Sequence, residues 1–323
     1  MNKVFSFCVG TCLFVSALNA EQKLPSSYSA EDLADIFYQL NYSAKHPKAK
    51  INHTKGFCAS GVFEPSKEIS KFVNVPLLTK DKIDAQIRYS LGGAIMDDKS
   101  KPRGMAIKMQ GDGDLWTMVM LNLPIVFAKN AKEFGDFFKM RIPVDGKVDS
   151  DFIKESMQKV NSYRNFDNYI NSIGITSSVA NTPFFSAHTF WFKSAKDDKM
   201  IAAKWRFEPV SGVKYLNKDE EKTLSNDYLS QRFKEHVKSS PVEYKMYLTL
   251  ANENDPVDDP ATLWKGKHKE VLAGTLKVYK YDGEGCNSDV YFPSEMPSGV
   301  SAPKDKLFDI RNEVYAITFG RRQ

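Results

Sequence analysis

The feature that most constrains the fold is a long series of short apolar runs, each ended by turn-forming residues. Runs of this length and spacing are typical of β-strands. Helices do not alternate regularly with them, so a parallel sheet of βαβ units is not expected. The pattern instead predicts an α+β protein, an antiparallel barrel or sandwich with added helices. The predicted strands cover residues 57–63, 85–89, 105–109, 116–121, 188–192, 201–207, 243–250 and 274–279.

Three segments show apolar residues at helical spacing instead. Residues 30–40 form an amphipathic pattern, which Ser29 can cap at its N-terminus. Residues 128–163 form a second helical segment, with phenylalanines gathered on one side, and residues 219–236 form a third. These segments are the added helices of the predicted fold.

The length and composition of the chain bound what it can be. Its 323 residues, 42% of them hydrophobic, are enough for one large domain or two ordinary ones. The net charge is only +5, and the basic residues are spread along the sequence. Binding to nucleic acid is therefore not expected, because it relies on a concentrated basic patch.

The N-terminus has the features of a secretory signal peptide. Lys3 precedes an apolar stretch over residues 4–18, and Ala20 is a small residue at a suitable cleavage point. A spanning helix needs ~20 apolar residues, so the stretch is short for one, although an uncleaved anchor stays open as an alternative. We expect a signal peptide over residues 1–20, a leader and helix over 21–44, with the leader flexible over 21–30, and a core over 45–323. The exported, periplasmic protein is expected to have no membrane span after cleavage.

Two cysteines follow the signal peptide, Cys58 and Cys286. An oxidising compartment would allow them to pair. The sequence does not show whether their Cα atoms lie within bridging distance, so the pairing stays open. No Cys-x-x-Cys motif or close histidine pair points to zinc.

No familiar motif identifies a catalytic or nucleotide-binding site. The nucleophile elbow, the phosphate loop and the dinucleotide fingerprint are all missing from the sequence. His53 stands alone at the entrance to a predicted strand, where a histidine is most often structural or exposed. Arg311 and Tyr315 have the spacing of one helical face. Taken singly, these residues indicate only a β-rich globular protein.

Several blocks of the sequence, in the same order, nevertheless resemble segments of the haem catalases. Residues 53–56 and 61–64 resemble the distal-histidine segment, and residues 311–315 resemble the proximal haem-ligand helix. The other similar blocks are residues 87–90, 102–108, 123–127 and 187–190. The resemblance implies a catalase-like antiparallel β-barrel with surrounding helices and a haem-binding core over residues 45–323. The chain stops soon after Tyr315, so it resembles the small catalase-related peroxidases, which lack the extra C-terminal parts of large catalases.

The resemblance implies roles for residues on both sides of a haem b. Tyr315 would be the iron ligand, and Arg311 would hold its phenolate, since a nearby cation favours the charged form of an acid. His53 would be the distal acid–base residue that transfers a proton between the two peroxide oxygens. Ser90 would hydrogen-bond to His53 and fix its orientation.

The resemblance also implies residues that bind the haem without touching the iron. Arg88 and Arg322 would pair with the haem propionates, because a guanidinium meets a carboxylate in a bidentate fork. Phe134 would stack on the porphyrin. Two neighbours depart from the family pattern: Lys50 replaces a propionate-binding arginine, and Asn52 replaces a small apolar residue beside His53.

A third departure affects the predicted chemistry. An ungapped comparison of residues 120–124 with the family segment places Leu121 at the catalytic asparagine. Strand alternation would turn the neighbouring Asn122 away from the haem. The loss of that amide should weaken the second step, in which another peroxide is consumed. We therefore expect peroxidase activity with weak catalase activity.

The predicted function is thus a haem-dependent peroxidase that reduces hydrogen peroxide or organic hydroperoxides with a small organic electron donor. The alternatives are a haem enzyme that rearranges fatty acyl hydroperoxides, a secreted haem-binding protein without activity, and a β-barrel carrier of small ligands. No nicotinamide cofactor is expected, because the family's NADPH-binding lysine is replaced near Pro209. A homo-oligomer is possible.

Overall fold

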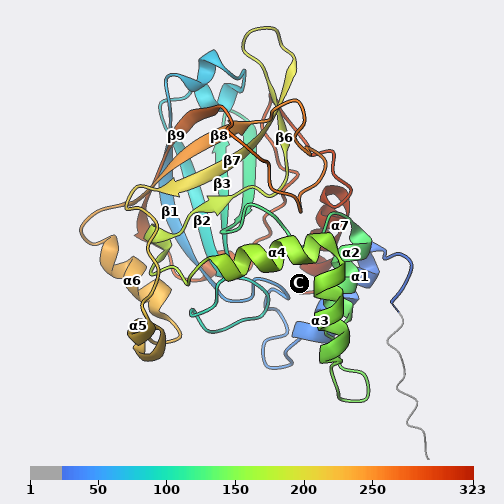
Figure 1. Ribbon diagram of the computed structural model, residues 1–323. Helices are drawn as coiled ribbons and strands as arrows, with labels where there is room; N and C mark the ends of the chain where they lie inside the picture. Colours follow the sequence, from blue (N-terminus) through green and yellow to red (C-terminus); the bar gives the residue numbers. More distant parts are fainter. Residues whose placement is uncertain (1–23) are drawn as a thin grey trace, which may run out of the picture.

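Eight antiparallel strands close into a barrel in the computed structural model, which describes residues 24–323 (Figure 1). The ring closes because β7 pairs with both β5 and β8. This confirms the predicted barrel and rules out the sandwich. The barrel strands are β1 (Gly56–Pro65), β2 (Ile83–Leu91), β3 (Arg103–Gly111), β4 (Asp114–Leu121), β5 (Phe184–Phe185), β7 (Met200–Pro209), β8 (Val242–Leu250) and β9 (Glu270–Tyr281).

Two further strands lie outside the ring. Strand β6 (Phe190–Lys193) pairs with β7, and β10 (Val300–Ser301) pairs with β6. Each predicted strand overlaps one observed strand, but the run predicted over residues 188–192 begins two residues later, at Phe190. His188 therefore lies before the strand, where its side chain is free to reach another element.

The barrel interior is the main hydrophobic core. Alternate residues of each strand point inward, as the twofold period of a strand requires. Trp116 and Trp205 are almost fully buried and meet edge to face, with ring centroids 5.6 Å apart. The strands thus form a rigid wall, and a site built on the outside of that wall is held in place by the core.

Helix α1 (Ala30–Asn41) matches the predicted helix. Ser29 accepts a hydrogen bond from the Asp32 N–H, and the Asp32 side chain bonds back to the Ser29 N–H, which completes a capping box. The other helices are α2 (Ala131–Lys139), α3 (Ser150–Lys159), α4 (Asn161–Ser172), α5 (Lys218–Thr223), α6 (Tyr228–His236) and α7 (Phe308–Gly320). Short 3₁₀ turns cover Ile69–Lys71, Pro76–Thr79, Val179–Asn181 and Gly285–Asn287.

Two of the predicted helices are interrupted. The segment predicted over residues 128–163 contains α2, α3 and the start of α4. Asp145 and Gly146 take positive φ angles in a turn after α2, and Val160 is extended between α3 and α4. The segment predicted over 219–236 splits into α5 and α6 at the polar sequence Ser225-Asn226-Asp227. Such residues favour turns over helix interiors.

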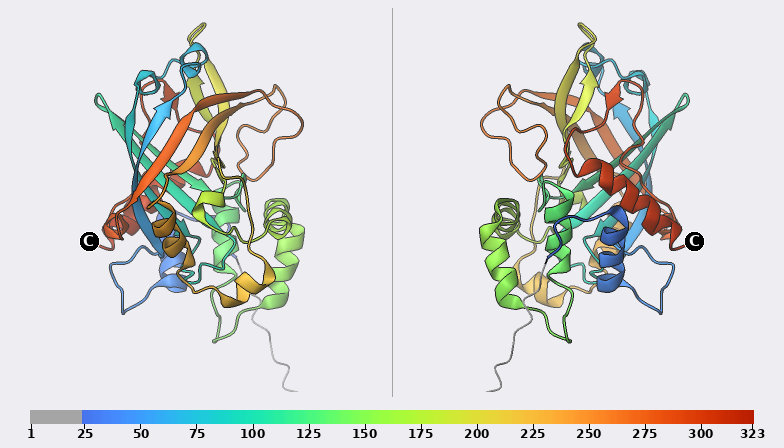
Figure 2. Two further views of the ribbon diagram at one scale, coloured as in Figure 1. Left: turned by 90° about the vertical axis from the view of Figure 1, so that its left-hand side faces the viewer. Right: turned by 90° about the vertical axis from the view of Figure 1, so that its right-hand side faces the viewer.

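Helices α1, α2 and α7 gather at one side of the lower end of the barrel, and α1 crosses beside α7 (Figures 1 and 2). Leu33 and Phe37 of α1 pack against Val314 of α7 in a second hydrophobic cluster. This cluster holds α7, which carries Tyr315, at a fixed distance from the barrel wall.

The predicted leader is not loose where the structure describes it. Tyr28 is buried, and its hydroxyl donates to Asp136 Oδ1 at 2.9 Å. Its ring lies so close to Gly135 that a side chain there would collide with it. The predicted signal peptide, residues 1–20, lies outside the described residues. Within the described part of the chain, no helix is long and apolar enough to cross a membrane.

Candidate active site

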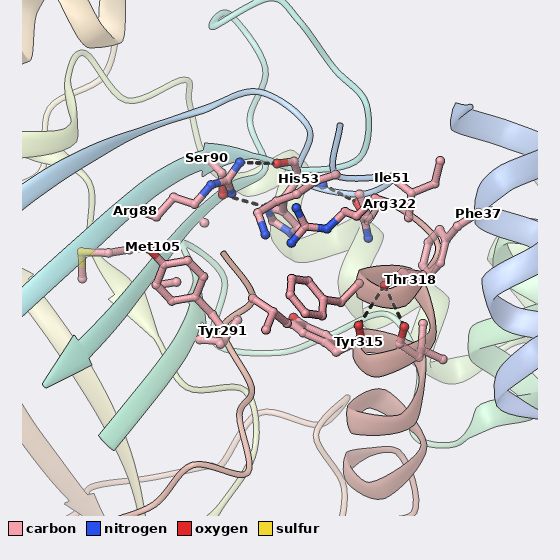
Figure 3. A pocket seen from close by; sticks show the side chains of 18 of the residues that line it. Phe37, Ile51, His53, Arg88, Ser90, Met105, Tyr291, Tyr315, Thr318 and Arg322 are labelled. Carbon is pink, nitrogen blue, oxygen red and sulfur yellow. Dashed lines mark hydrogen bonds between the residues drawn. The ribbon is translucent and has the colours of Figure 1, made fainter. Parts of the chain in front are cut away.

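A hollow lies between the outer face of β2, β3 and β4 and the helices α1, α2 and α7. It has two connected lobes, with about 780 and 840 Å³ of empty space when the open mouth is included. His53 and Tyr315 line both lobes. Figure 3 shows these two side chains on opposite sides of the hollow, with Arg88 and Arg322 beside His53. The hollow therefore presents different chemistry on its two sides.

The backbone of His53 has an unusual conformation. Its φ angle is +53°, in the left-handed region that a residue with a side chain seldom adopts. Asn52 Oδ1 accepts a hydrogen bond from the His53 N–H at 2.9 Å, and Arg88 Nη2 donates to the His53 carbonyl at 2.7 Å. These bonds stabilise a strained residue, which is a frequent property of functional sites.

The ring of His53 is fixed by its neighbours. Its Nδ1 lies 3.0 Å from Ser90 Oγ, which leaves Nε2 for the hollow. Gly104 backs the pair so closely that a Cβ there would lie 2.8 Å from Ser90 Oγ and 3.0 Å from a His53 ring atom. Burial, followed by the charge of Arg88, lowers the pKa of His53 to about 3. The imidazole is therefore neutral at neutral pH and can accept a proton.

Tyr315 ends a chain of polar side chains on the other side of the hollow. Arg311 Nη2 donates to the Tyr315 hydroxyl at 3.4 Å, and Arg311 Nη1 donates to His188 Nε2. Because Nε2 accepts, the proton of a neutral His188 lies on Nδ1, which donates to Asp305 Oδ2 at 2.7 Å. A fixed guanidinium thus lies against the phenol, on the helical face that the sequence predicts.

The pKa shifts of His188 and Asp305 are consistent with this row of hydrogen-bonded side chains. Burial lowers the pKa of His188, so the imidazole stays neutral. Burial alone would raise the pKa of Asp305, but the hydrogen bond from His188 holds it below its usual value. Asp305 Oδ1 also accepts from the N–H groups of Leu307 and Phe308 at the start of α7. An ionised carboxylate therefore anchors the chain that leads to Tyr315.

Three cations line the mouth of the first lobe: Lys50, Arg88 and Arg322. None forms an ion pair within residues 24–323, and the oxygens that they contact belong to carbonyl and amide groups. Burial, with the charges of Arg88 and Arg322, lowers the pKa of Lys50 to about 7. Asp289 acts on Lys50 and Arg322 only from beyond ion-pair distance, so their buried charge is incompletely balanced and this end of the hollow is suited to a ligand with carboxylates.

The second lobe is mostly apolar. Phe134, Leu121 and Ile310 line it, and Phe134 stacks with Phe127 at a ring distance of 5.2 Å. Asn122 points the other way, as strand alternation predicts: its Oδ1 accepts from the Arg103 N–H and its Nδ2 donates to the Lys101 carbonyl, both at 2.8 Å. The side chain that lines the lobe at this position is therefore the hydrocarbon of Leu121.

An iron porphyrin with two carboxylates fits this set of donors. The mostly apolar lobe suits the macrocycle, the cations without an ion-pair partner suit its propionates, and the phenol beside a guanidinium suits a ferric iron. The structure brings all the predicted site residues to this hollow: His53, Ser90, Arg88, Phe134, Arg311, Arg322 and Tyr315.

Sequence reasoning missed the roles of His188 and Asp305. His188 stands in one of the blocks that resemble catalases, and Asp305 precedes the Arg311–Tyr315 helix. The position of His188 inside a matching block was the available signal. Their contact joins residues 117 positions apart, which no local pattern reveals.

Comparisons with known proteins identify the family of this chain. The family model described as Catalase matches residues 37–322. A catalase-related peroxidase of Synechococcus elongatus is 27% identical over 280 residues, which cover 84% of this chain and 82% of that protein. The peroxisomal catalase of Toxoplasma gondii is 28% identical over 298 residues, covering 84% of this chain and 59% of the relative.

Solved structures show the same fold. Catalase A from Saccharomyces cerevisiae superposes with a TM-score of 0.75 at 18% identity, over 84% of this chain and 60% of that one. A fungal catalase superposes with a TM-score of 0.74 at 19% identity, over 84% and 58% of the two chains. The chain thus spans about three fifths of the length of these larger proteins.

Proposed function

This chain belongs to the catalase family and is an oxidoreductase, and from that premise we propose that it is a haem-dependent peroxidase. Its substrates are hydrogen peroxide or organic hydroperoxides, and a small organic molecule supplies the electrons. The observation that carries the proposal is the placement of His53 and Tyr315 on opposite sides of one hollow that has unpaired cations at its mouth.

Haem b, held by Tyr315 and by the cations, supplies the redox-active ferric iron. His53 supplies the proton transfer. With Nδ1 engaged by Ser90, its Nε2 accepts the proton of the near peroxide oxygen and delivers it to the far one, which leaves as water or alcohol. A positioned acid–base residue of this kind contributes about 10²–10⁴-fold to the rate. The low pKa of His53 keeps Nε2 free to act as the base.

Arg311 and the residues behind it hold the proximal side. Because Arg311 is fixed by His188, and His188 by Asp305, the guanidinium cannot turn away from the Tyr315 oxygen. A fixed positive charge stabilises the phenolate that an iron ligand requires. Arg88 and Arg322 bind the propionates and orient the ring within the hollow.

The balance of activities follows from Leu121. A side chain without a hydrogen-bond donor cannot hold a second peroxide next to His53, so oxidation of that second peroxide to oxygen is slow. Small organic donors then supply the two electrons instead. One peroxide and two donors, each of which gives up one electron and one proton, yield water, an alcohol or a second water, and two oxidised donors.

The test compares peroxide-dependent oxidation of small phenols with oxygen evolution by the same holoprotein. We expect the donor reaction to dominate. The matched variant Leu121→Asn should raise oxygen evolution, by up to about 10²-fold, since one well-placed donor has that effect in other active sites. Rapid oxygen release from the unchanged protein, at the level of large catalases, would contradict the proposed balance.

We also propose that the protein is exported and that its N-terminal segment, residues 1–20, is removed. A disulfide between Cys58 and Cys286 supports this proposal, because such bonds persist in oxidising compartments. N-terminal sequencing of the protein from its native cell fraction should begin at Glu21. A mature chain that retains Met1, recovered with the membranes, would indicate an uncleaved anchor instead.

A further inference from the structure

One short segment forms a wall of the mouth of the hollow. We call residues 285–289 the bracket segment. The Asn287 and Asp289 carbonyls accept from Arg322 Nη1 and Nη2 at 3.1 and 2.7 Å, and Lys50 Nζ also donates to the Asp289 carbonyl. Asn287 Oδ1 accepts from Arg88 Nε at 2.7 Å. The bracket segment therefore orients every cation at the mouth.

The bracket segment has little regular structure of its own. Its first residues form the short 3₁₀ turn Gly285–Asn287, and the next two residues that line the hollow, Val290 and Tyr291, follow directly. An irregular segment has many accessible conformations, and fixing it before a ligand binds costs entropy. Its positioning must therefore come from contacts with a rigid element.

That rigid element is strand β1. Cys286 forms a disulfide with Cys58 of β1, with 5.8 Å between the Cα atoms. One residue further, Asn287 Nδ2 donates to the Gly56 carbonyl at 3.0 Å. Both cysteines are buried, so the bond is protected from solvent. The covalent link thus ties the bracket segment to the strand that directly follows His53.

We infer that the Cys58–Cys286 disulfide is a positioning device for the cofactor: it fixes the bracket segment, which orients Lys50, Arg88 and Arg322 toward the cofactor carboxylates. Retention of haem therefore depends on this disulfide more strongly than the stability of the barrel does. Because the cations are already oriented, binding loses less entropy. The inference rests on the proposed function in that the ligand is a porphyrin with carboxylates.

The test measures haem release from the full-length protein. The double variant Cys58→Ala/Cys286→Ala is loaded with haem, and the transfer of haem to an excess of a haem-scavenging globin is followed by absorbance. We expect release to be about tenfold faster or more, which is the scale of lost pre-organisation. The matched control is Leu248→Ala, a fully buried position on β8 that does not line the hollow. It should lower the melting temperature of the apoprotein without changing haem release.

A second variant keeps the disulfide and removes the side-chain contacts of the bracket segment. Asn287→Ala should also accelerate haem release, and its effect should not add to that of the double cysteine variant, because both act through one segment. Hydrogen exchange of the apoprotein should show faster exchange in residues 285–291 when the disulfide is absent. This readout does not depend on haem or on activity.

The outcomes separate this inference from the proposed function. If the unchanged protein takes up no haem, both are overturned. If the unchanged protein holds haem but the double cysteine variant and Asn287→Ala release it at the same rate, only the inference is overturned. If Leu248→Ala accelerates release as much as the double variant does, the disulfide acts through general stability and the inference is again wrong.

Discussion

The backbone and the side chain of His53 are both tightly constrained. Its backbone is left-handed, its ring lies close to the backbone of Gly104, and its carbonyl accepts a hydrogen bond from Arg88. His53 thus links the proposed acid–base chemistry to the mouth of the hollow, where Lys50, Arg88 and Arg322 lie. A substitution at His53 tests the acid–base chemistry, and a substitution at Lys50 tests the binding of the cofactor carboxylates.

Replacement of His53 by glutamine should slow the reaction with hydrogen peroxide by about 10²–10⁴-fold, because the amide cannot accept and return a proton. The haem absorption of the variant should persist, since Tyr315 and the cations are unchanged. Stopped-flow absorbance at increasing peroxide concentration measures the rate. Ser90→Ala, which removes only the partner of Nδ1, should have a smaller effect. An unchanged rate in the His53 variant would exclude it from catalysis.

Lys50 should make haem binding depend on pH. Its pKa is about 7 in the cofactor-free protein. The propionates of a bound haem would favour the charged amine, so haem binding above pH 7 requires proton uptake. Affinity should be highest below that pH and should fall as pH rises, by at most about tenfold per unit. Lys50→Arg keeps its charge and should bind equally from about pH 6 to pH 9. Haem titrations of both proteins measure this; parallel curves would contradict it.

At the scale of elements, the site depends on how α1 holds α7 against the barrel. Phe37 of α1 packs on Phe134 and Phe138 of α2, with ring centroids 5.9 and 4.9 Å apart, and belongs to the same cluster as Val314 of α7. On the outer side, Arg321 Nη1 lies 2.7 Å from Asp35 Oδ1. Exposed ion pairs of this kind contribute little, so the aromatic cluster carries most of the attachment.

Phe37→Ala should therefore lower the free energy of unfolding by about 3–5 kcal/mol, the usual loss for a buried phenylalanine. It should also weaken haem binding, because Phe37 lines both lobes. Denaturant unfolding of the apoprotein measures the first effect. Tyr42→Ala, at the exposed end of α1, is the control and should change stability by less than about 0.5 kcal/mol. Similar losses in both variants would show that α1 is not anchored through Phe37.

The sequence predicts elements well where the pattern is local. The strands follow apolar runs with turn formers at both ends, and the start of α1 follows from Ser29 and Asp32. The interruption of the segment over 128–163 was not predicted, because its phenylalanines keep a helical spacing on one side of the turn only. The prediction of a flexible leader is wrong at Tyr28. Its burial depends on Gly135, more than one hundred residues away, which no local pattern shows.

At the scale of the whole molecule, the barrel acts as a wall that carries a site on its outer face. The resemblance to catalases located the site residues on both sides of the hollow, although each block alone was a weak signal. The links that join distant segments could not be predicted: the contact of His188 with Asp305 and the disulfide of Cys58 with Cys286 both depend on how the barrel closes. Those long-range contacts also fix the geometry that the chemistry needs.

The absorption spectrum of the purified protein tests the central claim most directly, with and without Tyr315→Phe. The unchanged protein should show a Soret band of a ferric haem with a tyrosinate ligand. The variant, which loses only the phenol oxygen, should lose haem or shift to the spectrum of a different ligation state. Two identical spectra, or a folded protein that never acquires the band, would contradict an iron held by Tyr315 opposite His53.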